Sequence, residues 1–220
     1  MIKKFSINKQ IALFFLFFTL ILVGCTQNLA PQTDSRTYLL VDDFQRMTSA
    51  WDTLESTDGS AIGYYDGWLL FLINAPDKEY ISTPKGIYSD IRLEAVAKKL
   101  SGSEDNYFGL VCRYQDENNY YAFLISSDGY FGVVKVLDGA YSLLNANMMQ
   151  FSAAIYQGEE FNHLHAGCIG KDLIFYVNKQ FLAAVQDDAF SSGEVGLFAG
   201  SGNEPNVAIG FDSFVILKPQ

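Results

Sequence analysis

The chain has 220 residues and a formal net charge of −10 at pH 7, from 15 lysines and arginines against 25 aspartates and glutamates. A surface of this sign disfavours nucleic acid and anionic lipid headgroups as partners. The length is sufficient for one full-sized hydrophobic core.

The N-terminal 24 residues have the pattern of an export signal. Residues 1–10 (MIKKFSINKQ) carry three lysines and no acid, and residues 11–23 (IALFFLFFTLILV) are apolar or nearly so. A membrane-spanning helix needs about 20 apolar residues, so a basic start before this shorter run favours a secretory signal peptide. The run ends in LVGC (22–25), which resembles a bacterial lipobox. We therefore predict a lipoprotein signal peptide over 1–24 and lipidation of Cys25. The alternatives are an uncleaved anchor, or an ordinary signal peptide followed by a chance cysteine.

Cleavage at this point predicts a domain on the extracytoplasmic side of a bacterial membrane. Acyl chains such as palmitate on Cys25 anchor a protein without spanning the bilayer. Residues 25–38 are mainly polar, contain a proline and lack apolar periodicity, which is typical of a flexible linker. Cleavage removes three lysines and no acid, so the net charge changes from −10 to −13. We therefore expect membrane contact through the lipid alone.

The rest of the chain is predicted to form strands. Short runs rich in Val, Ile, Phe and Tyr alternate with turn residues, and no long run has helical periodicity. Asp-Gly pairs, which favour tight hairpins, separate several runs. We predict an all-β domain over 39–220, a two-sheet antiparallel β-sandwich. Residues 143–155 are the one place for a short helix or loop. The predicted strands are 38–44, 67–73, 90–98, 107–114, 120–126, 130–137, 163–169, 173–178, 180–185, 194–200 and 207–217.

Two cysteines remain after the signal peptide, Cys112 and Cys168. Outside the cytoplasm an even pair is a disulfide candidate. Strand alternation places each of them on the apolar face of its strand. This permits a bridge but does not show that the two strands are neighbours, so two buried free thiols are the alternative.

Three stretches resemble a known superfamily. They are GLVCRYQDENNYYAFLISSDGYFGVVK (109–135), NHLHAGCIGKDLIFYVNKQFLAAVQDDAFSSGEVGLFAG (162–200) and IGFDSFVI (209–216). Together with the opening LLVDDFQRMTSAW (39–51), they resemble concanavalin A-like (laminin G-like) β-sandwich domains, closest to the 3-keto-disaccharide hydrolase-like family. The resemblance covers 39–218 and implies a concanavalin A-like jelly roll. The superfamily includes glycoside hydrolases, carbohydrate-binding modules and protein-binding domains, so it does not determine the activity.

The sequence argues against a catalytic site. Glycosidases use two carboxylates about 5 to 9 Å apart, and some members of this superfamily carry them at alternate positions of one strand. No such motif occurs here, since Glu94 and Glu194 lie in predicted strands without a carboxylate two residues away. His163 and His165 share a strand face, but a third metal ligand is not evident. We predict no catalytic residue and two surface histidines; distant acids brought together by the fold remain the alternative.

A binding surface is predicted from the hairpins around the DENN loop (116–119). If Gln115 pairs with Tyr120, and Asp128-Gly129 forms a two-residue turn, several aromatic and cationic side chains share the outer face. Such a patch would suit a polar or acidic glycan, and related sandwiches usually bind ligands on the broad concave sheet. An ordinary solvated sheet face is the alternative. The predicted ligand-binding residues are Tyr107, Arg113, Tyr120 and Lys135.

The resemblance also implies a calcium site, because such sandwiches often bind calcium between their first and last strands. Asp42, Asp43 and Asp212 lie at the matching ends of this chain. Calcium takes six to eight oxygen ligands, so backbone oxygens would have to complete the set. Acids that cap strand ends are the alternative.

These inferences predict a surface-tethered lipoprotein whose sandwich recognises a carbohydrate or other cell-surface ligand without catalysis. A glycoside hydrolase of the 3-keto-disaccharide hydrolase-like family is the first alternative. A protein-binding or structural module is the second. Nucleic acid is not an expected partner.

Overall fold

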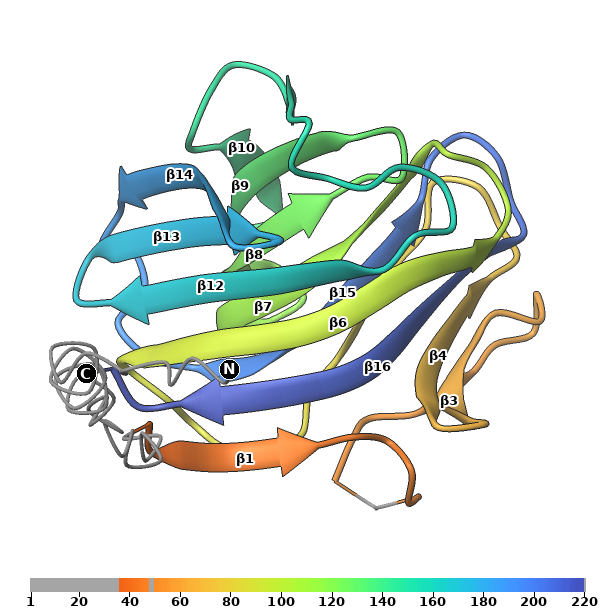
Figure 1. The fold of residues 1–220 in the computed structure, drawn as a ribbon, viewed down its shortest axis with the longest axis horizontal. Coiled ribbons are helices and arrows are strands. Elements are labelled where there is room, and N and C mark those ends of the chain that lie inside the picture. Colours follow the sequence, from red (N-terminus) through yellow and green to blue (C-terminus); the bar gives the residue numbers. More distant parts are fainter. Residues whose placement is uncertain (1–35, 48–49, 220) are drawn as a thin grey trace, which may run out of the picture. The chain divides into compact units, whose positions relative to one another are not determined.

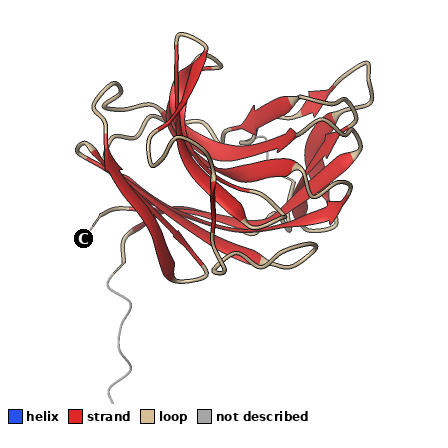
Figure 2. Cartoon of the chain, turned by 90° about the horizontal axis from the view of Figure 1, so that it is seen from above, coloured by secondary structure: helices blue, strands red, loops and turns tan. Residues whose placement is uncertain are grey.

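A computed structural model describes residues 36–47 and 50–219 (Figure 1). The predicted signal peptide, Cys25 and residues 25–35 of the predicted linker lie outside these ranges. Figure 2 shows strands joined by loops throughout the described chain. Within these ranges, no helix is long and apolar enough to cross a membrane.

The described residues form sixteen strands, five of which the sequence did not predict: β2, β3, β5, β10 and β11. The strands are β1 Tyr38–Asp42, β2 Leu54–Glu55, β3 Ala61–Tyr65, β4 Trp68–Ile73, β5 Glu79–Ser82, β6 Ile91–Ser101, β7 Asn106–Asp116, β8 Asn119–Ile125, β9 Tyr130–Leu137, β10 Ala140–Leu143, β11 Gln150–Phe151, β12 Asn162–Ile169, β13 Asp172–Val177, β14 Gln180–Gln186, β15 Glu194–Ser201 and β16 Val207–Leu217. Residues 143–155 contain the last residue of β10, the strand β11 and loops rather than a helix.

The strands form two antiparallel sheets, as predicted. Sheet A has the order β14-β13-β12-β6-β16-β4-β3-β2, and β1 also pairs with β16. Sheet B has the order β10-β9-β8-β7-β15-β5, and β11 also pairs with β9. Many neighbours in each sheet are distant in sequence, such as β6 beside β16 and β7 beside β15 (Figure 1). This is the two-sheet jelly-roll arrangement.

Alternation along the strands produces the core between the sheets. In β6, Ile91, Leu93 and Ala95 are buried while Arg92 is exposed and Glu94 is half-buried, which is the period of two of a strand with one face in the core. In β7, Cys112 likewise lies in the core, on the apolar face predicted for it. Burial of apolar surface by both sheets is the main stabilising contribution to such a fold.

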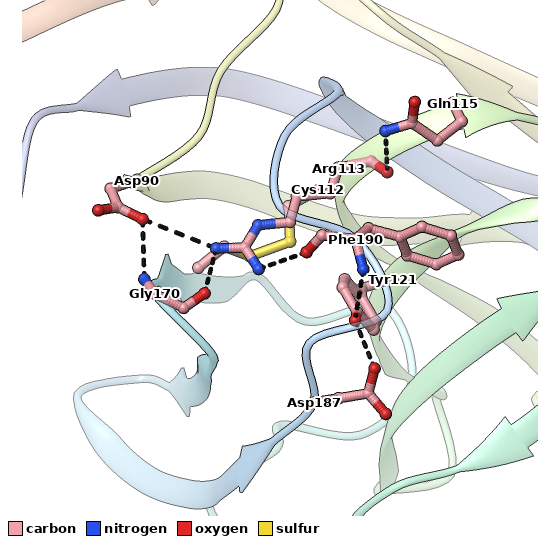
Figure 3. The surroundings of a disulfide bond; sticks show 9 residues. Asp90, Cys112, Arg113, Gln115, Tyr121, Gly170, Asp187 and Phe190 are labelled. Carbon is pink, nitrogen blue, oxygen red and sulfur yellow. Dashed lines mark hydrogen bonds and ion pairs between the residues drawn. A yellow bond between two sulfur atoms is a disulfide. The ribbon is translucent and has the colours of Figure 1, made fainter.

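A disulfide joins the two sheets. Cys112 in β7 of sheet B is bonded to Cys168 in β12 of sheet A, with their Cα atoms 6.8 Å apart (Figure 3). The predicted pairing is therefore present in the structure. The strand order allows this bridge. β6 lies beside β12 in sheet A, and the chain passes directly from β6 to β7 in sheet B.

The hairpin registers differ from the predicted ones in two places. Asp116 pairs with Asn119 at the tip of the β7–β8 hairpin, but Cys112 pairs with Tyr121. Residues 113–115 are therefore opposite Tyr120 alone, as a β-bulge that adds two residues to β7. Because this shift is even, the residues of β8 keep the faces that the predicted pairing of Gln115 with Tyr120 gives them.

The β8–β9 turn has one residue more than predicted. The Ser126 N–H donates to the Tyr130 carbonyl, and Gly129 has φ of 96°. The loop therefore spans the three residues 127–129, a length that places a left-handed residue at its end. Because the difference is odd, β9 presents the opposite face from the predicted one, and Val134 rather than Lys135 lies on the outer side of sheet B.

Candidate functional site

The outer face of sheet B is concave. Tyr141 in β10 donates a hydrogen bond to the Glu79 carboxylate in β5, with 2.9 Å between the oxygens. These are the two edge strands, separated by five strand spacings, which is about 24 Å in a flat sheet. One tyrosine and one glutamate side chain do not span that distance. The sheet therefore curves around this face, and the Tyr141–Glu79 bond crosses it from edge to edge.

Two hollows lie on the concave face, and both are lined by Glu79, Tyr141 and Phe198. One has a volume of about 600 Å³ and extends along Tyr107, while the other has about 390 Å³ and extends along Tyr114 and Tyr120. Because the shared residues include both ends of the Tyr141–Glu79 bond, this bond lies where the hollows meet. We call the whole concavity the tyrosine groove. Its remaining lining residues are Tyr80, Ile81, Glu117, Asn118, Leu124, Val134, Ser142, Leu143, Ala146, Asn147 and Met149.

Alternation and two glycines build the floor of the groove. Tyr107, Tyr120 and Phe198 occupy outward positions of β7, β8 and β15 and pack with the other outward apolar residues of sheet B. A Cβ at Gly109 would lie 1.9 Å from a β8 backbone oxygen, so this position accepts only glycine. A Cβ at Gly132 would lie 2.5 Å from the Leu143 side chain, which packs over β9 at this point.

The loop after β10 forms one wall. The Val133 N–H donates to the Asn145 side-chain oxygen at 2.8 Å, and the Leu144 N–H donates to the Val133 carbonyl at 2.8 Å. These bonds fix the loop against β9 and place Asn147 and Met149 at the rim. The wall is thus held by specific hydrogen bonds rather than by apolar contact alone.

Burial raises the pKa of several groups in the groove. Partial desolvation raises the pKa of Glu79, against the opposing effect of the hydrogen bond from Tyr141. Burial, followed by the contact with Tyr141, raises the pKa of Tyr120 far above its ordinary value; the two hydroxyl oxygens are 3.4 Å apart. Burial and then the nearby Asp105 raise the pKa of Tyr107. The tyrosines are therefore uncharged hydrogen-bonding groups with aromatic faces.

Two of the four predicted ligand-binding residues lie in the groove. Tyr107 and Tyr120 share the outer face of sheet B as expected. Tyr120 is only 2% exposed, so its ring forms the floor and its hydroxyl group, beside Tyr141, is its one route to a ligand.

The prediction that Arg113 lies on the outer face is wrong. Arg113 is 1% exposed and lies in the β7 bulge with φ of 53°, which turns its side chain towards the disulfide end of the sandwich (Figure 3). Its guanidinium group donates to the carbonyls of Phe190 at 2.7 Å and Gly170 at 2.6 Å, and lies 3.7 Å from the Asp90 carboxylate. These contacts give Arg113 a structural role.

The prediction for Lys135 is also wrong, because of the three-residue turn before β9. Lys135 pairs with Tyr121 and shares its face, away from the groove. Its ammonium group forms an ion pair with Asp187, which also accepts a hydrogen bond from the Tyr121 hydroxyl. Burial raises the pKa of Asp187, but the hydrogen bonds and charge of its partners outweigh burial and lower it overall.

The proposed calcium ligands are not gathered together. Asp42 accepts hydrogen bonds from the Phe44 N–H and the Trp51 indole N–H, both at 2.9 Å. Asp43 accepts one from the Gln45 N–H, and Asp212 lies in an irregular part of β16. Among the described residues, no three His, Cys, Asp or Glu side chains are grouped to hold a metal ion. Calcium binding stays a prediction, which thermal melts with and without a chelator test.

Three residues that line both hollows were not among the predicted ligand-binding residues: Glu79, Tyr141 and Phe198. Phe198 was in a predicted strand, but its face was not assigned. Tyr141 follows the Asp138-Gly139 pair, which predicts a hairpin, and that hairpin would pair Tyr141 with Val136 as the structure does. Glu79 lies in an unpredicted strand, and no local signal connects it to Tyr141.

Fold and site together define a jelly-roll β-sandwich with an aromatic groove on its concave sheet. No protein-family model and no curated protein sequence matches the chain. Solved structures with the same fold include the carbohydrate-binding module CBM66 from Bacillus subtilis, with a TM-score of 0.54 and 17% identity over 73% of this chain and 91% of the module. A Bacillus licheniformis β-glucanase has a TM-score of 0.61 and 9% identity, over 86% of this chain and all of the glucanase.

A third similar structure is the glycoside hydrolase family 43 protein BlXynB from Bacillus licheniformis. It has a TM-score of 0.61 and 18% identity over 81% of this chain, which spans 39% of that protein. At these identities the similarities establish the fold and leave the ligand open.

Proposed function

We propose that the tyrosine groove binds a carbohydrate chain without hydrolysing it. The observation that carries the proposal is the concave face itself, which combines aromatic side chains with neutral hydroxyl groups and one partly desolvated carboxylate. Sugar rings present apolar C–H faces to aromatic rings and hydroxyl edges to polar groups. The fold neighbours named as a carbohydrate-binding module, a glucanase and a glycoside hydrolase support a carbohydrate as the ligand, and they do not separate binding from hydrolysis.

The two hollows suit a chain better than a single sugar. Each lies on one side of the Tyr141–Glu79 bond, and both reach that bond. Tyr141 is 59% exposed, so its side chain is free to rotate away from Glu79. We propose that a ligand spans both hollows and that its hydroxyl groups replace the Tyr141–Glu79 hydrogen bond.

The carboxylates of the groove support binding rather than hydrolysis. Among the described residues, Glu79 is the only acidic side chain that lines the larger hollow, and the smaller one adds only Glu117, which is exposed in the β7–β8 turn. Hydrolysis of a glycosidic bond generally needs a pair of carboxyl groups held on either side of it. Within the groove, the raised pKa of Glu79 favours the hydrolase alternative, because a general acid must be protonated.

A glycan array with the full chain, followed by affinity and turnover measurements on the hits, tests the proposal. Tyr141→Ala should weaken binding about tenfold or more, since truncation of a central aromatic contact costs more than about 1 kcal/mol. Tyr65→Ala is the matched control, because Tyr65 is 69% exposed on sheet A and touches neither hollow.

Turnover separates binding from hydrolysis. We expect no new reducing ends from any hit with the wild-type chain. Release of reducing ends that is lost in Glu79→Gln would establish the hydrolase instead. Absence of any glycan signal would leave a protein-binding module as the explanation.

We further propose that this domain is displayed on the membrane surface by the lipid on Cys25. The acidic charge of the chain supports attachment through lipid rather than through headgroups. A groove on a tethered domain would hold glycans close to the cell surface.

A further inference from the structure

A separate hollow lies on the opposite side of the sandwich, on the outer face of sheet A. It has a volume of about 270 Å³ and lies over β6, β12 and β13. Its floor is Gly167, which is paired with Arg92 on one side and Ile174 on the other. A Cβ at Gly167 would have only ordinary contacts, 3.8 Å from Ile174 and 4.0 Å from Ile169. The missing side chain therefore leaves a notch in the sheet surface, without any backbone need for glycine.

The next row of the sheet completes the hollow. His165 is paired with Glu94 on one side and Tyr176 on the other. His165 Nδ1 lies 3.5 Å from a Glu94 oxygen, and Arg36 lies 3.3 Å from the same oxygen. Tyr176 is 39% exposed. The β13 wall of the hollow, with Ile174 and Tyr176, is thus apolar and aromatic. The β6 wall is polar and carries the Glu94 carboxylate, which His165 and Arg36 hold in place.

Two cationic side chains at this hollow have no ion-pair partner among the described residues. Arg92 and Lys179 both line it and are exposed, and within the described part of the chain neither side chain has an ion-pair partner. Lys179 follows Asn178 in the β13–β14 turn, where both residues have positive φ. The Asn178 side chain fixes this turn, because its oxygen accepts from the His163 N–H and its amide group donates to the Ala154 carbonyl. Within the described residues, both cations are therefore available to a ligand carboxylate.

We propose that this hollow binds a single acidic sugar ring, with its carboxylate on Arg92 and Lys179. Ile174 and Tyr176 offer an apolar wall for the C–H face of a ring. The Glu94 carboxylate is an acceptor for ring hydroxyl groups, and the two cations match a ligand carboxylate. A neutral sugar would leave the cations without a partner, and a small acid without a ring would leave the apolar wall unused. The site is independent of the tyrosine groove, which lies on the other sheet.

Titration calorimetry of the full chain with glucuronate, glucose and acetate tests this inference. Glucuronate should bind at least about tenfold more tightly than either of the other two, because it alone has both a ring for the apolar wall and a carboxylate for the cations. Methyl glucuronide serves as a further probe, because its substituted C1 resembles a sugar at the end of a polysaccharide. Binding of glucuronate alone indicates a free acid as ligand, and binding of both indicates a chain end as well; either result supports the acidic-ring chemistry.

Three variants locate the binding. Gly167→Val should abolish it by filling the notch, and Arg92→Met should weaken it at least about tenfold. Lys171→Met removes an exposed charge outside the hollow and should leave the affinity within about twofold. Thermal melts of each variant check that it is folded; Arg92 is exposed, so its substitution tests the site even if Gly167→Val is unstable.

The inference is overturned by any of three results. The first is that glucuronate does not bind, or binds no better than glucose or acetate. The second is that Lys171→Met weakens binding as much as Arg92→Met, which would indicate a general charge effect. The third is that Tyr141→Ala abolishes glucuronate binding while Arg92→Met leaves it intact, which would place the sugar in the tyrosine groove.

Discussion

Substitution of Arg113 separates a structural role from a ligand-binding role. In Arg113→Met the apolar stem is kept and the guanidinium group is lost, which leaves the Phe190 and Gly170 carbonyls without their donors. Each hydrogen bond to a charged group contributes about 1.5–3 kcal/mol. The Asp90 carboxylate is 53% exposed at 3.7 Å and adds little. We therefore expect the free energy of unfolding to fall by about 3–5 kcal/mol.

Thermal unfolding under non-reducing conditions measures this loss. For a domain of this size about 1 kcal/mol corresponds to about 2–4 °C, so Tm should fall by about 6–20 °C. Arg113→Lys should fall between wild type and Arg113→Met, because one ammonium group does not reproduce the two-pronged guanidinium contact. Arg46→Met, at an exposed arginine, is the control and should change stability by less than about 0.5 kcal/mol.

An Arg113→Met variant with the wild-type Tm would contradict the structural role of Arg113. A variant with unchanged Tm and lost glycan binding would restore the ligand-binding role that the sequence suggested. At temperatures where the variant is folded, we expect its glycan affinity to equal that of the wild type, since the guanidinium group does not line the groove.

Three further outcomes are expected. Alkylation without reductant should label neither Cys112 nor Cys168, and Cys168→Ser should cost about 4 kcal/mol, the chain-entropy value for a loop of this length; labelling of both thiols would contradict the bridge. The pKa of Asp187 is lowered in the folded state, so its contribution to stability is present above about pH 3.8 and is lost as pH falls through the lower folded-state pKa. Asp187→Asn should therefore reduce the slope of unfolding free energy against pH in this acid range. Equal slopes for wild type and variant would argue against the Lys135 ion pair. Cys25→Ser should move the protein from the membrane to the soluble fraction, and mass spectrometry of the wild-type N-terminus should find acyl chains on Cys25, whereas an unmodified residue there would refute the lipid anchor.

The sandwich is predictable from sequence because its signals are local. Alternation in β6 and β7 and the Asp-Gly turns identify strands and their buried faces without knowledge of partners. Short strands such as β2 and β11 have only two residues each, which is too short for any periodicity. They exist because longer neighbours offer free backbone groups to pair with.

The residues on the binding face are harder to predict, because one residue more or less in a bulge or hairpin loop changes the register of the next strand. An even shift at the Arg113 bulge left the faces of β8 unchanged, whereas one extra residue in the loop before β9 moved Lys135 to the other face. The Tyr141–Glu79 contact depends on the curvature of a whole sheet, because it joins two edge strands. No pattern within either strand encodes that contact.

The most direct test of the carbohydrate-binding groove is an NMR titration of the full chain with ring-labelled tyrosines, using the strongest glycan from the array. We expect the ring signals of Tyr107 and Tyr141 to shift on binding, while that of Tyr65 on sheet A does not. A glycan that binds without moving the Tyr107 and Tyr141 signals would contradict the assignment of the groove as the ligand site.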